Sequence, residues 1–259
     1  MKNYLLLLFI FCACLSIDAQ NVSKLRIGFE MGGSAMMGEM NDRWEFRKPW
    51  NRYSDYDSYY YGSDNAEGEG NMFYARLKTE LPLLKDWLTL SSGLRYTHFN
   101  ERIFTYGDSH LYLFHPSQQG IELFRVNEIN ESLGYLTVPL EADVAIFGKV
   151  RRWHVFVKGS IQAGIKVDGK TRLDFVSNSM KKYESEILAA AGDAPSDFMS
   201  SLYGSVGFRF IFDNQIRITI ENTMPHLFLT KNNFSLITPE GEVGFQASVT
   251  VPMNFFSNK

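Results

Sequence analysis

Few residues of this sequence could carry acid–base or nucleophilic chemistry. A histidine near a serine, or a pair of carboxylates, could supply a general base or activate a nucleophile. The histidines are His98, His110, His115, His154 and His226. His98 is close to Glu101 and Asp108 in sequence, and Glu141 and Asp143 lie two positions apart, so each group is a candidate dyad.

Structural roles explain the same residues more simply. His98 falls at the loop end of an alternating segment, where an interfacial or loop histidine is the ordinary interpretation. Glu141 and Asp143 share one face of a predicted strand, and buried charges need partners, so we expect pairing with Lys158 or Arg95. We therefore predict no catalytic residue, no cofactor and no metal site.

The element that positions these carboxylates is a hairpin formed by residues 135–147 and 153–167. In both arms apolar and polar residues alternate with period two, which indicates extended strands with one apolar face. Five residues, 148–152, separate the arms, enough for a tight turn. A membrane-spanning strand needs about 9–11 residues, and both arms reach that length.

The same pattern recurs along the chain and predicts an all-β fold, an antiparallel transmembrane β-barrel of about eight strands. The predicted strands are residues 24–36, 72–84, 87–99, 135–147, 153–167, 201–212, 215–223 and 243–253. Their connections alternate between long and short, as in barrels with short periplasmic turns and long extracellular loops. Ten strands would result if the inserts after Asn100 or Asp168 hide a further hairpin. We expect a short helix at residues 179–191, and strand extensions at 111–114 and 121–124.

A soluble barrel with an apolar interior would show the same alternation, so the polar face decides the orientation. That face is rich in glycine and serine and carries charges of both signs, as a crowded lumen requires. The apolar face carries no charge, and a charge there would cost about 2–4 kcal/mol at mid-membrane. We therefore expect the apolar face to contact lipid. The predicted lumen charge network is Arg95, Glu141, Asp143, Lys158, Arg209, Arg217 and Glu221.

The N-terminus resembles a targeting segment. Lys2, an apolar run and the end Ile17-Asp18-Ala19 predict a signal peptide at residues 1–19 and a barrel domain at 20–259. Lipoprotein cleavage before Cys14 is the alternative. Cys12 and Cys14 are the two cysteines of the chain, so a chain starting at Gln20 has neither a disulfide nor a thiolate. A net charge of −3 gives no electrostatic case for nucleic acid.

The long insert after the first predicted strand is the best binding candidate. It is rich in Trp, Tyr and Arg, and exposed residues of these types dominate binding hot spots. Loops on a rigid scaffold also commonly carry function. The candidate residues are Trp44, Phe46, Arg47, Trp50, Arg52, Tyr53, Tyr56, Tyr59 and Tyr60. A loop that packs on itself over the barrel mouth is an equal alternative. The acidic residues of this insert lack the spacing of a calcium loop.

The strand Tyr135-Leu136-Thr137-Val138-Pro139-Leu140, with Gly93-Leu94-Arg95-Tyr96 before it, resembles the outer-membrane β-barrel domain family of Bacteroidetes. That family includes the PorT-like proteins and is akin to small OmpA-like or OmpW-like barrels, and its motif is a strand Tyr-Leu-x-Ile-Pro-Leu. The resemblance covers nearly all of the mature chain. It implies a small barrel, with some members tied to secretion of surface proteins.

These observations together predict a non-enzymatic protein of the cell outer membrane. Its expected contacts are outer-membrane lipid and a protein partner at the extracellular loops, and the role is structural or binding, accessory to a secretion or uptake assembly. A small pore for solutes is one alternative, if the lumen charges leave a path open. An outer-membrane lipid-modifying enzyme or protease is the other.

Overall fold

The computed structural model describes residues 25–40, 66–83, 87–105, 110–114, 123–149, 152–190, 194–231 and 233–253. The predicted signal peptide, the candidate binding loop and the two residues between the predicted strands 72–84 and 87–99 lie outside these ranges. None of the helices in the described ranges is long and apolar enough to cross a membrane.

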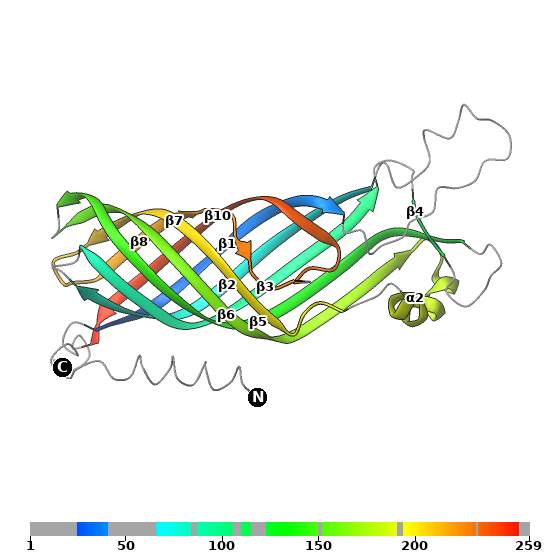
Figure 1. Ribbon diagram of the computed structural model, residues 1–259, viewed down its shortest axis with the longest axis horizontal. Helices are drawn as coiled ribbons and strands as arrows, with labels where there is room; N and C mark the ends of the chain where they lie inside the picture. Colours follow the sequence, from blue (N-terminus) through cyan, green and yellow to red (C-terminus); the bar gives the residue numbers. More distant parts are fainter. Residues whose placement is uncertain are drawn as a thin grey trace, which may run out of the picture.

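Eight antiparallel strands form a closed ring (Figure 1). They are β1 (Arg26–Met40), β2 (Ala66–Leu83), β3 (Leu88–Thr105), β5 (Leu123–Lys149), β6 (Trp153–Phe175), β7 (Phe198–Ile211), β8 (Arg217–Thr223) and β10 (Ile237–Pro252). Their order around the ring is β3-β2-β1-β10-β8-β7-β6-β5, and β5 pairs with β3 to close it. The first and last strands pair directly, from Arg26 opposite Pro252 upward. Closure leaves the ring without a free edge, which confirms the predicted eight-stranded barrel.

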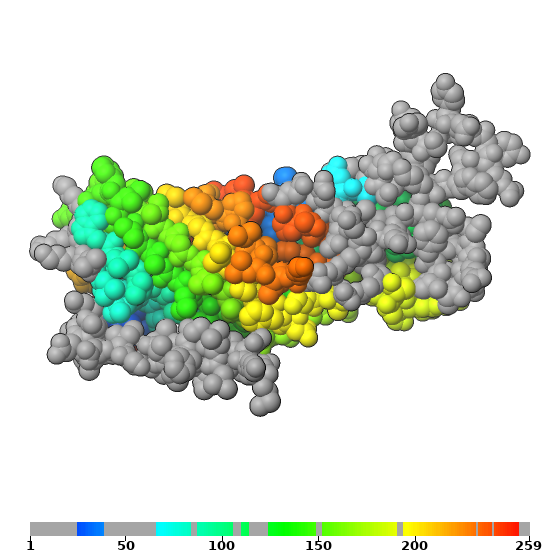
Figure 2. Space-filling view, in the orientation of Figure 1, coloured from blue at the N-terminus to red at the C-terminus, as the bar shows by residue number. Residues whose placement is uncertain are grey.

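Two short strands lie outside the ring, so within the described residues the ring has eight strands and not ten. β4 (Leu111–Phe114) pairs with the start of β5, and β9 (Leu227–Phe228) pairs with β7. β4 fulfils the expected extension at 111–114, because it adds to β5 and forms no further membrane hairpin. In Figure 2 the residues around β9 (orange) lie against those of β7 (yellow).

Side chains alternate between the lumen and the outside of the ring as predicted. On β2, Tyr74, Arg76 and Lys78 are buried in the lumen, whereas Phe73 and Leu77 are 50% and 67% exposed. The same alternation on the other strands produces a continuous belt of exposed apolar side chains. Because charged groups are inside and apolar groups outside, the belt faces hydrocarbon, as expected for a barrel that spans a membrane.

Several strands continue beyond this belt at one end, to the right in Figure 1. β5 and β6 are 27 and 23 residues long, well beyond the predicted 135–147 and 153–167. Outside the belt their outward residues are polar, such as Arg125 and Arg172, so the membrane pattern that set the predicted ends stops while the hydrogen-bonded ladder continues. The expected helix is present as η4 (Asn178–Tyr183) and α2 (Glu184–Ala190), which packs Ile187 against this extension.

The turn between β7 and β8 is longer than the two residues, Asp213 and Asn214, that separate the predicted strands 201–212 and 215–223. The amide of Phe212 bonds to the carbonyl of Ile216, and the amide of Gln215 bonds to the carbonyl of Phe212. The loop therefore has three residues, and Gln215 takes the positive φ of 67° that closes such loops. β8 begins at Arg217, two residues after the predicted start, because Gln215 belongs to the turn.

An apolar cluster fills the barrel at the same end as the strand extensions. Its largest buried members include Phe99, Tyr135, Ile103 and Met199, contributed by β3, β5 and β7. Residues 233–237, which we call the mouth plug, enter this cluster just before β10 and are all buried. The rings of Phe234 and Phe99 meet edge to face with centroids 5.2 Å apart. We call the end of the barrel with the strand extensions the mouth. The barrel interior thus has an apolar section at the mouth and a charged section between the mouth and the short turns.

Candidate functional site

The structure places all seven residues of the predicted lumen network inside the barrel. Arg95, Glu141, Asp143, Lys158, Arg209, Arg217 and Glu221 are each at most 5% exposed. Four further charged residues from β1 and β2 join them, namely Glu30, Arg76, Lys78 and Glu80. Sequence reasoning did not include these four in the site. Alternation shows that a side chain points inward, but not which strands meet across the lumen.

Glu141 is the centre of the network. Its carboxylate lies 2.6 Å from the Arg76 guanidinium, 3.4 Å from that of Arg95 and 3.6 Å from the Lys158 ammonium. It also accepts hydrogen bonds from the hydroxyls of Ser91 (2.8 Å) and Tyr203 (2.7 Å). Both predicted partners are therefore in contact with Glu141, and Arg76 is nearer than either. A carboxylate with this many donors is fully compensated in a buried site.

Asp143 belongs to a separate cluster nearer the short turns. It pairs with Arg209 at 2.8 Å, and the same guanidinium donates to the Thr89 hydroxyl at 3.1 Å. Glu141 and Asp143 thus each have their own cation, and the arrangement does not bring them together as an acid–base dyad.

The remaining pairs connect strands around the ring. Lys158 on β6 contacts Glu221 on β8 at 2.5 Å, and Arg95 on β3 contacts Glu30 on β1 at 2.9 Å. A chain of pairs then joins β1 to β2 and β8. Its links are Glu30–Lys78 (3.0 Å), Lys78–Glu80 (3.1 Å) and Glu80–Arg217 (3.6 Å). The charged section of the lumen is occupied by side chains that bind one another.

The candidate catalytic histidine does not meet its candidate carboxylate. His98 is on the outward face of β3, where its Nε2 lies 3.4 Å from the Ser132 hydroxyl, whereas Glu101 points into the barrel. His154 is buried in the lumen, with Nε2 3.4 Å from Arg209. Asp108 and His115 lie outside the described residues.

His226 forms the closest histidine–carboxylate pair among the described residues. Its Nδ1 is 2.8 Å from Glu242 on β10, and its ring lies against Tyr203 with centroids 4.5 Å apart. Sequence reasoning missed this pair because the two residues are separated by a segment assigned to a loop. The pair is buried inside the barrel and ties the segment around β9 to β10. No group of three or more metal-ligating side chains occurs in the described ranges.

The mouth plug is held by two carboxylates. Glu101 on β3 accepts from the backbone amides of Leu236 and Ile237, both at 3.3 Å. Glu131 on β5 accepts from the amide of Ser235 at 3.0 Å and from its hydroxyl at 2.6 Å. These bonds fix the plug to β3 and β5 of the barrel wall.

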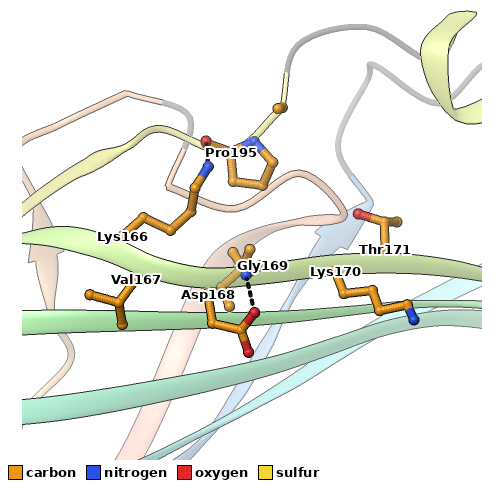
Figure 3. Close-up of a pocket in the computed structure, with 9 residues that line it drawn as sticks. Lys166, Val167, Asp168, Gly169, Lys170, Thr171 and Pro195 are labelled. Atoms are coloured by element: carbon orange, nitrogen blue, oxygen red, sulfur yellow. Dashed lines mark hydrogen bonds between the residues drawn. The ribbon is translucent and has the colours of Figure 1, made fainter.

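A pocket of about 390 Å³ lies where β6 extends beyond the start of β7 (Figure 3). Lys166 crosses it, with its ammonium 2.6 Å from the Pro195 carbonyl oxygen and 2.8 Å from Asp197. The amide of Gly169 donates to the Asp168 carboxylate at 2.9 Å. The Lys166 ammonium and the Asp168 carboxylate at this pocket thus already have partners within the chain.

Comparisons with known proteins give only distant structural similarity. No family model matches the chain, and no curated protein matches its sequence. The outer membrane protein OprG from Pseudomonas aeruginosa is similar over 90% of this chain and 99% of its own, with 9% identity and a TM-score of 0.37. The translocator domain of the autotransporter NalP from Neisseria meningitidis is similar over 96% and 94%, with 8% identity and a TM-score of 0.34. CarO from Acinetobacter baumannii is similar over 72% and 97%, with 15% identity and a TM-score of 0.31.

These comparisons give no support for the Bacteroidetes family in particular. The fold itself rests on the closed antiparallel ring, its even strand number, the apolar belt outside and the charged lumen inside. The protein is a β-barrel of the cell outer membrane.

Proposed function

We propose that this protein is a non-enzymatic scaffold that presents extracellular structure to a protein partner. In this proposal it acts as an accessory of a secretion or uptake assembly. That is the role implied by the resemblance of the strand 135–140 to the PorT-like family.

The observation that carries the proposal is a contrast between two parts of the molecule. Side chains fill the interior of the barrel, whereas the strand extensions beyond the belt support further ordered structure. The lumen is packed with ion pairs centred on Glu141, and the mouth plug covers its upper end. Beyond the belt, β5 and β6 support an ordered ledge, composed of β4, η4 and α2. Ile187 of α2 is buried there, and the rings of Phe124 and Phe175 pack edge to face. A ledge that packs against the apolar cluster of the barrel mouth is a rigid platform, as binding loops require.

Two features favour a non-enzymatic role. Glu141 and Asp143 are compensated by separate cations, so neither is available as a base. His98 faces away from Glu101, and its hydrogen-bonding partner is a serine on the outer wall. The loop residues from Trp44 to Tyr60 remain the predicted partner contacts and lie outside the described ranges.

Photo-crosslinking in native membranes tests the binding role. A crosslinking amino acid at Lys182 on the ledge, or at Trp44 in the loop, should capture one discrete partner. The same probe at Asn214, in the short turn at the opposite end, is the matched control and should not. Equal products from both ends, or none from any position, would contradict the proposal. Deletion of residues 44–61 should then abolish capture while heat-modifiable gel migration persists.

A small solute pore is the competing function, and bilayer recording separates the two. We expect the purified barrel to be electrically silent in planar bilayers, because paired side chains occupy the lumen. Reproducible single-channel steps would overturn the scaffold as the complete function. Steps whose size changes in Lys158→Ala would locate the path in the lumen itself.

A further inference from the structure

Two buried carboxylates face each other at the mouth of the barrel. Glu101 on β3 and Glu131 on β5 are direct cross-strand partners, and each is 2% exposed. Side chains opposite each other on neighbouring strands have Cβ atoms about 4.5–5.5 Å apart. The pair lies above the membrane belt, since the neighbouring outward residues of β3 are Asn100 and Arg102.

Both carboxylates use their lone pairs to hold the mouth plug. Glu101 Oε2 accepts from the amides of Leu236 and Ile237, while Glu131 accepts from Ser235 and from the Thr171 hydroxyl at 2.9 Å. Oε1 of Glu101 is buried and has no hydrogen-bond partner among the described residues. A buried carboxylate oxygen without a donor is costly when charged, and much less so when it carries a proton.

No cation compensates this pair within the part of the chain that the structure describes. The residues opposite the pair on the adjoining strands are uncharged, Gly70 on β2 and Thr171 on β6. The other titratable groups that face inward at this end come from β5, β6, β10, α2 and the segment before β9, and each has its own partner. They are Tyr135 (Ser196 carbonyl), Lys166 (Asp197), Glu242 with His226, and Glu184 (Leu173 amide).

Ionising both carboxylates at this separation in a buried site costs free energy, because their like charges repel. Burial, and then the neighbouring Glu131 carboxylate, raise the pKa of Glu101 well above its ordinary value, although the amides of Ile237 and Leu236 act in the opposite direction. Glu101 thus keeps a proton at pH values where an exposed glutamate has lost it.

We propose that Glu101 and Glu131 hold one proton between them, and that this proton fastens the mouth plug to the barrel wall. The plug is then a lid whose closure depends on pH. With the proton on Glu101 the pair carries one negative charge and both carboxyl groups keep their bonds to residues 235–237. When the proton leaves to solvent, two charges repel inside the mouth and the plug loosens.

The sign follows from linkage. Glu101 binds its proton more tightly with the plug closed than with the plug open. Closing the plug therefore takes up a proton, and opening it releases one. The stabilisation is complete below the ordinary glutamate pKa. It is lost as pH rises through the raised pKa of Glu101. The lid therefore closes in acid and loosens towards alkaline pH.

Hydrogen exchange of the full chain in lipid nanodiscs tests this lid between pH 5 and pH 9. The exchange of residues 233–237 is normalised at each pH to the same peptide in denaturant, which removes the intrinsic pH dependence. A one-proton opening predicts that the normalised opening constant rises up to tenfold per pH unit. Residues 201–211 of β7 serve as the internal control and should show no such rise.

Variants distinguish the shared proton from a general loosening. Glu101→Gln cannot ionise, so its plug should exchange independently of pH. Glu131→Gln removes the neighbouring carboxylate that raises the pKa of Glu101, so its rise should end at lower pH and be smaller than in wild type. Glu69→Gln, an exposed glutamate of β2 at the same end, should behave as wild type. A flat wild-type profile, an unaltered rise in Glu101→Gln, or an equal rise in β7 would each overturn the proposal.

Discussion

Arg76 on β2 and Glu141 on β5 form a 2.6 Å ion pair although β3 lies between their strands in the ring. Both side chains are completely buried. The contact shows that lumen charges reach past their immediate neighbours and connect distant parts of the wall. It also explains why the barrel is filled, because each long charged side chain extends toward the axis to find its partner.

Loss of Glu141 should be among the most destabilising single changes in the lumen. Glu141→Gln leaves the cations Arg76, Arg95 and Lys158 without their shared counter-charge, and breaking a buried pair costs about 3–5 kcal/mol. The measurement is the free energy of unfolding in urea, in lipid vesicles. Glu69→Gln is the control, since its 2.5 Å pair with Arg102 is half-exposed and should contribute at most about 1 kcal/mol. Equal losses in the two variants would contradict the network.

Glycines facing the lumen should not tolerate side chains that outward glycines accept. A Cβ on Gly207 would lie 2.5 Å from the Phe156 ring and 2.6 Å from the Glu221 side chain. Gly207→Val should therefore lower the free energy of unfolding by about 1–3 kcal/mol through overpacking. Gly159 on β6 faces outward with nothing within 4 Å, so Gly159→Val should leave folding intact. The measurements are the folded yields and the urea midpoints of the two variants. A lower stability of Gly159→Val than of Gly207→Val would contradict the assignment of Gly207 to the lumen.

A charge in the middle of the apolar belt should be costly. Ile161 is exposed on the lipid side of β6, far from both ends of the belt. Ile161→Arg should cost about 2–4 kcal/mol in vesicles. Asn71→Arg carries the same new charge on β2 beyond the belt, and should cost much less because water reaches it. Should both variants unfold at the same urea concentration, the belt would not mark the hydrocarbon.

The mouth plug should depend on its aromatic anchor. Phe234 packs edge to face against Phe228 and Phe99, and Phe234→Ala should cost about 3–5 kcal/mol locally. Hydrogen exchange of residues 233–237 should accelerate by roughly 100-fold, the factor that corresponds to about 3 kcal/mol. Phe245→Ala removes a lipid-facing ring of β10 and should leave the plug protected. Unchanged plug exchange in Phe234→Ala would show that the anchor is elsewhere.

Strand positions and the two faces of each strand were predictable because a single physical constraint sets both. Hydrocarbon forbids charge outside and the ring needs polar, small or paired groups inside, so Phe73 and Arg76 already indicate their faces in the sequence. The same constraint ends at the membrane surface. This is why most of the upper halves of β5 and β6 was missed, apart from the extension expected at 121–124, since outward Arg125 and Arg172 no longer carry the membrane pattern.

Partners across the lumen were less predictable. Lys158 and Arg95 were predicted as partners of Glu141 and Asp143. Both contact Glu141, but its nearer partner Arg76 depends on how far a side chain reaches past β3, and Asp143 pairs with Arg209 instead. The mouth plug was missed for a related reason. Phe234 and Leu236 lie in a stretch with no clear period, and only the fold brings Glu101 and Glu131 to its backbone amides. Pairing over long sequence distances leaves no local signal.

The central claim is that the apolar face of each strand contacts hydrocarbon, and lipid quenching tests it most directly. A fluorophore is attached to single cysteines in a chain that starts at Gln20, at Val157 and Ile218 on the outer face and at Thr219 on the inner face. In vesicles with brominated acyl chains, we predict strong quenching at Val157 and Ile218 and little at Thr219. Strong quenching at Thr219 with none at Val157 and Ile218 would contradict the account.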